Sequence, residues 1–522
     1  MKHDHISFID YNMDQLILPL DLEVTIPTHH LARLVNEAVE QLDESLLLEQ
    51  YKGGGRSSYH PKMMLKILVY AYADRIYSGR KIEKALQENI YLMWLSGNQK
   101  PDFRTINRFR SERIKPIIYD VFFSILELLH EKRLVKLEDY YLDGTKVEAN
   151  ANKYTWVWLK ATKRYEKGLD EKFRKIVFDI ERHLEGELQE DTLGVQEKLN
   201  EDPITSSDIQ KTMDKVNEHL KKEPKDKTLK KAKKQLEKDL LPRKQKYEHQ
   251  RKTANGRNSY SKTDPDATFM RMKEDHMKNG QLKAGYNIQI GTENQFITGF
   301  SLHQRAGDPK CLIPHLELLN QYRNLPDTII ADSGYGSEEN YAYLEQLEKE
   351  AYVPYNTFEN EKKKSWKQKV ERAENMDYDE ELDEFICANK KRLVFHYESK
   401  RTTENGFESI KRRYRCVECK DCPFQSQCAK GKESKTIMIS MENRRQRREM
   451  KERLNSKEGK EKYSQRKIDV ETVFGQTKFN QGFNRFHLRG LSKTTVEWGL
   501  VCAAHNLKKW ENSIKRKTKI GS

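Results

Sequence analysis

No stretch of this 522-residue chain reaches the roughly 18 consecutive apolar residues that a membrane-spanning helix needs. The first residues, MKHDHISFIDYNMDQLILPLDL, also lack the basic start and long apolar run of a signal peptide. We therefore expect a cytoplasmic protein with no membrane partner.

Apolar residues are scarce throughout. They make up 36% of the sequence, and the mean hydropathy is −0.93, which is typical of long, charged helices exposed to solvent. Lys and Arg outnumber Asp and Glu by 96 to 81, so the formal net charge is +15. This excess favours a polyanionic partner, nucleic acid first, although a ribosomal or membrane-surface protein would show it too. The length predicts about two to four domains.

Cysteine is also rare, yet five of the seven cysteines fall between residues 387 and 428. These five are Cys387, Cys416, Cys419, Cys422 and Cys428. In a reducing compartment such clustering favours a metal site over disulfides. We predict a structural metal, Zn²⁺ before an iron–sulfur cluster, bound by the last four, with Cys387 able to replace one. The alternative is a mobile segment with metal-free thiols.

Residues 1–136 show helical patterns and are expected to form an N-terminal domain. After the turn SGNQKPD, the segment FRTINRFRSER brings several arginines together. A short helix, a turn and an Arg-rich helix are typical of a helix-turn-helix that binds DNA. We predict that Arg108, Arg110 and Arg113 contact DNA. A plain helical bundle with solvated arginines is the alternative.

Residues 159–262 are highly charged and carry sparse apolar seams at helical spacing. The first seam consists of Leu169, Phe173, Ile176, Ile180 and Leu184. Further seams run through residues 209–220 and 229–240, and KEPKDK lies between them. The pattern predicts amphipathic helices or a coiled-coil-like hairpin.

Strand patterns occur at residues 140–143 and again from residue 286 onward. Residues 286–290 and 296–302 alternate around the turn GTENQ, and helices and strands then alternate up to residue 356. We predict a mixed α/β core formed by residues 137–158, 263–356 and 439–522. The helical segment and a Cys-rich segment, residues 357–438, would interrupt it.

Two aspartates end predicted strands: Asp143 in YYLDGTK and Asp332 in IIADSGYG. A carboxylate at the rim of a sheet is oriented by its strand and accessible, which suits metal coordination. Either aspartate taken alone is more typical of a turn that ends a strand than of catalysis. Asp264 and Asp266, in TDPDA, are predicted to be turn or cap residues.

The ordered motifs YYLDGTKVEANANKYT, TDPDA, GYNIQI, IIADSGYGSEENY and VETVFGQTKFNQGFNRFHLRG resemble those of the DDE transposases of bacterial insertion sequences. The closest branch carries its last acid on a Tyr…Arg/Lys…Glu…Lys helix. The resemblance implies an RNase H-like core in which three carboxylates hold two divalent ions, Mg²⁺ or Mn²⁺. Carried onto this sequence, the three are Asp143, Asp332 and Glu471.

The same helix carries the basic residues of the motif. Tyr463, Lys467 and Glu471 are spaced by four and share a face. Tyr463 and Lys478 would contact DNA phosphates, together with Arg466 or Lys467. Both remain candidates because the interval from Tyr463 to Glu471 is one residue longer than the usual pattern of the family.

The resemblance implies a function as well. Such a protein binds the terminal inverted repeats of its insertion sequence, cuts the double-stranded DNA there and joins the ends to target DNA. It would act as at least a homodimer, associated with the bacterial nucleoid when bound. The alternatives are an RNase H-like nuclease that does not join ends, and a DNA-binding descendant without activity.

Overall fold

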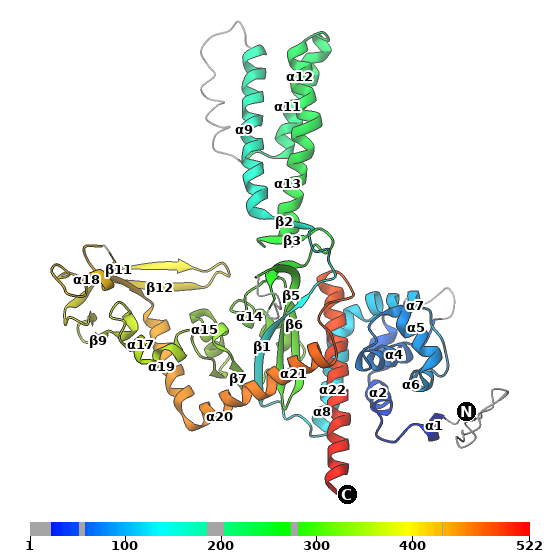
Figure 1. Cartoon of the computed structure of the whole chain (residues 1–522). Coiled ribbons are helices and arrows are strands. Elements are labelled where there is room, and N and C mark those ends of the chain that lie inside the picture. Colours follow the sequence, from blue (N-terminus) through cyan, green and yellow to red (C-terminus); the bar gives the residue numbers. More distant parts are fainter. Residues whose placement is uncertain (1–21, 52–57, 185–202, 273–279, 431, 522) are drawn as a thin grey trace, which may run out of the picture. The chain divides into compact units, whose positions relative to one another are not determined.

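The computed structural model describes residues 22–51, 58–184, 203–272, 280–430 and 432–521 (Figure 1). The chain divides into two compact units. The first comprises residues 1–136, 480–482 and 496–522, and the second comprises residues 137–479 and 483–495. Among the described helices, none is both long enough and apolar enough to cross a membrane.

The first unit is helical in its described part, as predicted for the N-terminal region. Its elements are α1 (Leu22–Thr25), α2 (Leu31–Glu40), α3 (Glu44–Leu48), α4 (Pro61–Ala73), α5 (Gly79–Glu88), α6 (Ile90–Leu95), α7 (Phe103–Arg108), the π-helical η1 (Phe109–Arg113), η2 (Lys115–Ile117), α8 (Ile118–Glu131) and most of α22 (Leu491–Gly521). Helix α4 is buried along nearly its whole length because its sequence, PKMMLKILVYAYA, is almost entirely apolar. We predicted residues 439–522 as part of the α/β core, whereas α22 from Val496 onward lies with these helices.

The second unit is built on a six-stranded mixed sheet. Its strands are β1 (Asp139–Glu148), β4 (Thr268–Arg271), β5 (Leu282–Glu293), β6 (Phe296–His303), β7 (Thr328–Ala331) and β8 (Glu350–Tyr352). Strand β1 pairs antiparallel with β5 and parallel with β7, β8 follows β7, and β4 and β6 both pair with β5. Helices α14 (Leu312–Asn320) and α15 (Glu338–Gln346) lie between strands in sequence. The predicted mixed α/β class is confirmed.

Local sequence explains several details of this sheet. The turn between β5 and β6 is formed by Asn294 and Gln295, both left-handed with φ of 52° and 62°, as a tight hairpin requires. Asp264 accepts hydrogen bonds from the Tyr286 hydroxyl and the Gly490 amide, and Asp266 accepts one from the Leu491 amide. These two aspartates therefore hold the start of α22, in line with the predicted turn or cap role.

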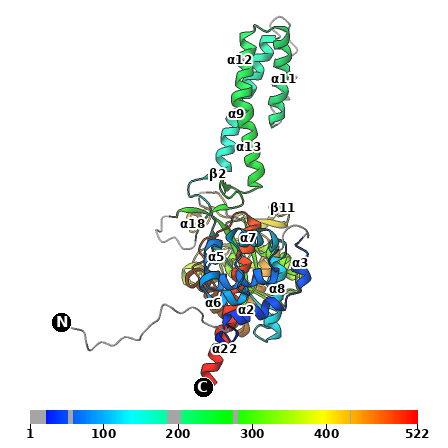
Figure 2. The same ribbon diagram turned by 90° about the vertical axis from the view of Figure 1, so that its right-hand side faces the viewer.

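Helices fill the interval between the short strands β2 (Trp156–Trp158) and β3 (Ser259–Ser261). They are α9 (Leu159–Leu184), α11 (Ser206–Lys222), α12 (Lys227–Gln235), the π-helical η3 (Leu236–Leu240) and α13 (Leu241–Ala254). They lie side by side in both ribbon views (Figures 1 and 2). The predicted turn KEPKDK joins α11 to α12.

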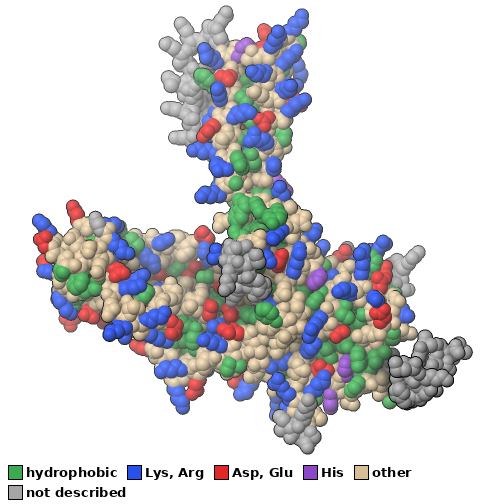
Figure 3. All heavy atoms as spheres, viewed as in Figure 1, with side chains coloured by type: hydrophobic (Ala, Val, Ile, Leu, Met, Phe, Trp, Pro, Cys, Tyr) green, Lys and Arg blue, Asp and Glu red, His purple; other side chains and the backbone are tan. Residues whose placement is uncertain are grey.

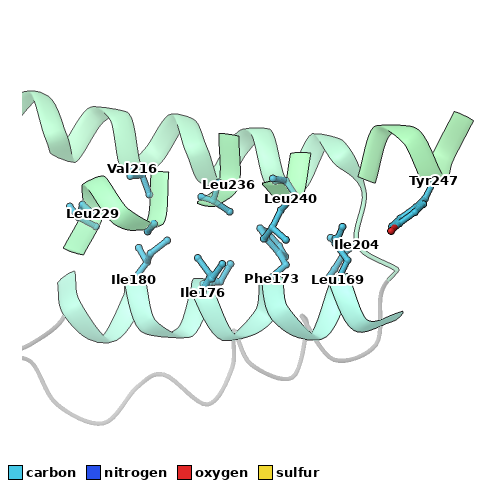
Figure 4. Packing of buried hydrophobic residues seen from close by; sticks show 13 residues of the cluster. Leu169, Phe173, Ile176, Ile180, Ile204, Val216, Leu229, Leu236, Leu240 and Tyr247 are labelled. Carbon is cyan, nitrogen blue, oxygen red and sulfur yellow. The ribbon is translucent and has the colours of Figure 1, made fainter. Parts of the chain in front are cut away.

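The predicted seams form the core of these helices. Leu169, Phe173, Ile176 and Ile180 of α9 point toward Leu229, Leu236 and Leu240 across the bundle (Figure 4). Leu184, the last residue of the predicted seam, is exposed. Lys and Arg side chains are spread over the outside of the bundle (Figure 3), as on a solvated face.

The Cys-rich segment, residues 357–438, contains a second sheet that we did not predict. Its antiparallel strands are β9 (Asp377–Asp379), β10 (Glu384–Ile386), β11 (Arg392–Thr402), β12 (Glu408–Cys416) and β13 (Thr436–Ile439). Short helices α16 (Phe358–Glu361), α17 (Lys364–Lys367), η5 (Ala373–Asn375) and α18 (Gln425–Cys428) accompany it. The chain then continues through α19 (Met441–Asn455), α20 (Lys457–Arg466), η6 (Lys467–Glu471), α21 (Thr472–Gly475) and η7 (Gln476–Asn480), of which η6 and η7 are π-helical.

Glu338 connects this second sheet to α15. Its carboxylate accepts hydrogen bonds from Ser409, Lys411 and Ser440, with the Lys411 Nζ at 2.8 Å. Burial alone would raise the pKa of Glu338, but these hydrogen bonds outweigh it and the pKa is lowered. The ionised carboxylate therefore stabilises the contact between α15 and the second sheet.

Replacing this carboxylate tests the connection. We expect Glu338→Gln to lower the free energy of unfolding by about 2 kcal/mol at neutral pH, because hydrogen bonds to a charged group are lost. A lowered pKa gives stability that is complete above the ordinary value of 4.5 and is lost as the pH falls through the folded-state pKa. The difference between wild type and variant should thus shrink below about pH 4.5 in urea titrations. The exposed Glu348→Gln is the control, and an equal loss there would contradict this account.

Candidate active site

Asp143 and Asp332 lie next to each other at the sheet rim. Strands β1 and β7 are parallel, with Leu142 paired to Ala331, so the two aspartates follow at the next position of neighbouring strands. Adjacent strands are about 4.8 Å apart. Asp143 is only 8% exposed, whereas Asp332, just beyond the end of β7, is half-buried and accepts a hydrogen bond from the Gly334 amide at 2.8 Å. The sheet therefore brings the two predicted carboxylates together, although Asp143 lies within β1 and not, as we predicted, at its end.

A polar network lies beside this pair. The Tyr335 hydroxyl donates to Gln289, and Asp308 accepts hydrogen bonds from Asn287 at 2.8 Å and Gln289 at 3.2 Å. Burial raises the pKa of Tyr335 well above its ordinary value, and the charges of Asp308, Asp143 and Asp332 add to this effect. A third carboxylate, Asp308, thus lies near the two aspartates.

Gly144 allows this close packing. A Cβ atom at this position would lie 2.6 Å from an Asp308 oxygen and from the Gln289 amide nitrogen. Sequence reasoning did not single out Asp308. The available signal was the polar pair Asn287 and Gln289, which alternate with Tyr286, Ile288 and Ile290 on β5. Both polar residues are fully buried.

Arg466 lies against Asp143. Its Nη1 is 3.4 Å from Asp143 Oδ2, and the residue is only 7% exposed. The buried Nε and Nη1 atoms make no hydrogen bond within the described part of the chain. A buried guanidinium with unused donors beside carboxylates suits a further acceptor such as a phosphate oxygen.

The π-helical turn η6 lies between Arg466 and Glu471. A π turn bonds residues five apart instead of four, so it absorbs the additional residue between Tyr463 and Glu471. Glu471 itself is exposed, as is Lys467. Of the two basic candidates, Arg466 is therefore the one beside the aspartates.

The other two predicted contacts on this helix lie in different surroundings. Tyr463 is half-buried, and the Arg466 guanidinium lies 5.7 Å from its ring. Burial raises the pKa of Tyr463, while Arg466 opposes the shift and Asp332 adds to it. Lys478 is 2% exposed and donates to the Lys146 carbonyl of β1 at 2.9 Å. It fixes the helix to β1, and the phosphate contact that we predicted for it stays a prediction.

The donor chemistry at the rim suits a hard divalent cation. Asp143 and Asp332 offer carboxylate oxygens, which Mg²⁺ and Mn²⁺ prefer. Among the described residues, no group of three or more His, Cys, Asp or Glu side chains is arranged to hold a metal ion as the chain stands.

The three N-terminal arginines do not share one environment. Arg110 is 3% exposed and donates to the Tyr72 hydroxyl at 2.7 Å and the Tyr77 carbonyl at 2.9 Å, so these hydrogen bonds hold it within the helical unit, and its DNA contact stays a prediction. Arg113 is half-buried, donates to the Gln50 carbonyl and lies 4.7 Å from the Tyr51 ring. Arg108 is exposed at the end of α7.

The five clustered cysteines line one small cavity of about 20 Å³. All of them are free thiols. Burial raises the pKa of Cys416 to about 12, and the neighbouring Cys419 contributes through a side-chain hydrogen bond. The cluster is therefore real in space as well as in sequence.

Two family models match the chain. Residues 386–510, which include the helix carrying Arg466 and Glu471, match a model described as Transposase DDE domain. Residues 20–112, which form most of the described N-terminal helices, match a model described as Transposase domain (DUF772). Comparison with curated proteins and with solved structures gave no match.

Proposed function

We propose that this chain, which carries a transposase domain in its N-terminal part and a DDE transposase domain in its C-terminal part, cuts DNA at the ends of an insertion sequence and joins those ends to target DNA. The two matches confirm the predicted resemblance to DDE transposases. The observation that carries the proposal is the rim of the sheet. There, Asp143 and Asp332 lie on neighbouring strands beside the buried Arg466, whose helix continues into Glu471.

The fold supports this proposal. The mixed sheet with β1 at its centre is compatible with an RNase H-like core. On this view the helices between β2 and β3 and the Cys-rich sheet are insertions into that core. The helices come after β1, which carries Asp143, and the Cys-rich segment comes after β8, beyond Asp332 at the end of β7. The candidate acids therefore remain with the shared sheet while the insertions extend from it.

Asp143, Asp332 and Glu471 would hold the divalent ions, Mg²⁺ or Mn²⁺. Two such ions supply Lewis acidity and lower the pKa of bound water in phosphodiester cleavage. The donors fit because all three are carboxylates and because Glu471 is exposed, at the end of the π turn that follows Arg466. Asp143 and Asp332 are fixed by strand pairing and Glu471 by its helix, so the helix is the part that must adjust.

The remaining residues of the site bind and orient the DNA. The buried Nε and Nη1 of Arg466 would donate to a phosphate oxygen next to the carboxylates. Tyr463, packed on the Arg466 guanidinium, would limit its movement. The network of Tyr335, Gln289 and Asp308 would fix the backbone around Gly144 and so hold Asp143 in place. Exposed Lys467 would contribute only general attraction to the polyanion.

The N-terminal helices would bind the terminal inverted repeats. Basic residues are exposed on α5 and α7, which contact each other. They are Arg80, Lys81, Lys84, Arg104 and Arg108. Arg80 and Arg104 lie 5.0 Å and 5.7 Å from the Phe103 ring, which fixes them side by side. Joining two ends requires two active sites, so a homodimer is the expected working form.

A DNA-cleavage assay tests the proposal. Purified protein is given Mg²⁺ and a DNA duplex carrying the element's terminal repeats, alongside a duplex of scrambled sequence. We expect cleavage at the repeat ends, followed by a joined product with target DNA, and binding that weakens with salt by a slope of about −0.9 per phosphate contact. Cleavage without joining would support a nuclease instead. Binding without cleavage at any divalent-ion concentration would support a DNA-binding descendant.

A further inference from the structure

We propose that Cys387, Cys416, Cys419 and Cys428 bind one Zn²⁺ ion that holds the Cys-rich sheet together. This site is separate from the rim that carries the carboxylates and does not depend on the proposed function. Four thiolates in a closed set are typical of a structural zinc ion.

Packing separates these four cysteines from the fifth. Cys416 and Cys419 are buried in the apolar cluster of the Cys-rich sheet, and Cys387 and Cys428 pack directly against that cluster. Cys422 lines the same cavity but is not part of the cluster, and its sulfur accepts a hydrogen bond from the Asn389 side chain at 3.5 Å. The structure thus favours Cys387 as the fourth ligand over Cys422.

The backbone around the thiols has the geometry of metal-binding turns. Cys387 and Lys390 form a tight turn in which Lys390 is left-handed, and the amide of Cys387 donates to the Lys391 carbonyl. Asp421, also left-handed, lies in the turn after Cys419. The Lys435 amide donates to the Cys419 sulfur at 3.3 Å, an interaction that stabilises a thiolate.

The four residues come from three separate places in the sheet. Cys387 follows β10, Cys416 ends β12 with Cys419 just beyond it, and Cys428 ends α18. A single ion would therefore tie the end of β10, the end of β12 and the short helix together. The apolar cluster here has only seven buried members, two of which are cysteines, and cores this small usually need a metal or disulfides.

The cavity is of the right size for one ion. Its volume of about 20 Å³ accommodates roughly one water-sized sphere. In the described residues, the sulfur atoms do not yet have the arrangement that would hold a metal ion. Each Cys side chain has a single torsion, so rotation of the thiols toward the cavity is the movement that binding requires.

Metal analysis of the full-length protein tests this proposal. Protein purified without chelators should contain about one zinc per chain, and Co²⁺ added to chelator-treated protein should give the absorption of a tetrahedral thiolate site. Cys387→Ser, Cys416→Ser, Cys419→Ser and Cys428→Ser should each lose most of the zinc. Cys422→Ser in the same segment, and Cys311→Ala in the mixed sheet region, should retain it.

Three other outcomes would contradict the proposed ligands, the proposed metal or the site itself. Loss of zinc in Cys422→Ser with retention in Cys387→Ser would replace the ligand set. Iron with acid-labile sulfide in place of zinc would identify a cluster. Wild-type protein that neither contains zinc nor binds Co²⁺ would refute the site, and this measurement remains valid if a serine variant fails to fold. The DNA-cleavage proposal is unaffected by any of these results.

Discussion

Asp143→Asn and Asp332→Asn are each expected to reduce DNA cleavage at least about 1,000-fold while leaving DNA binding nearly unchanged. A neutral amide removes one of the anionic oxygens that would hold the divalent ions. The stabilisation of the transition state by these ions is worth several kcal/mol. Cleavage rates on a repeat-end duplex and affinities in Ca²⁺, measured side by side, check the expectation.

The strand itself provides the control for this experiment. Asp327 precedes β7 at the end opposite to Asp332 and forms an exposed ion pair with Lys349 at 3.2 Å. Asp327→Asn should therefore cleave at the wild-type rate. Equal activity in all three variants would mean that these carboxylates do not act in cleavage.

Arg466→Gln should both destabilise the protein and abolish productive cleavage. Both side chains of the ion pair between Arg466 and Asp143 are buried. Removing the guanidinium therefore leaves a buried carboxylate without a compensating charge, which should lower the free energy of unfolding by about 3 kcal/mol. Lys467→Gln changes the next residue, which is exposed, and should alter stability by less than about 0.5 kcal/mol. Urea unfolding and cleavage rates distinguish the two.

Divalent ions provide a second test of the same pair. If Asp143 holds a cation, Mg²⁺ should restore part of the stability that Arg466→Gln loses, since it supplies the missing positive charge. A larger defect in Lys467→Gln than in Arg466→Gln would reassign the basic position of the motif. A stability of Arg466→Gln that does not respond to Mg²⁺ would contradict cation binding at Asp143.

Much of the fold could be predicted because the signals were local. The alternation around GTENQ identified the β5–β6 hairpin, and the 3–4 spacing of Leu169, Phe173 and Ile176 identified the core of α9. Leu184 departs from that seam at the last residue of α9, where local periodicity does not decide burial. The second sheet was missed because its strands, such as RLVFHYESKRT, are as charged as the surrounding helices.

The candidate site could be predicted only in part, because some of its signals are local in sequence and others are not. Asp332 follows the end of β7, as the sequence predicts, but Asp143 lies in the middle of β1, and the adjacency of the two depends on the parallel pairing of these strands. Arg110 and Lys478 resemble surface cations in sequence, and only tertiary packing turns them inward onto Tyr72 and the Lys146 carbonyl. The π turn at Lys467–Glu471 likewise has no local signature, yet it explains the additional residue in the motif.

The position of the catalytic ions tests the central claim most directly. The protein should be crystallised with Mn²⁺ and a cleaved repeat end, and the manganese located from its anomalous signal. We expect manganese within about 2–2.5 Å of carboxylate oxygens of Asp143, Asp332 and Glu471 together. Manganese bound elsewhere, or Glu471 remaining away from both aspartates with DNA in place, would contradict the account.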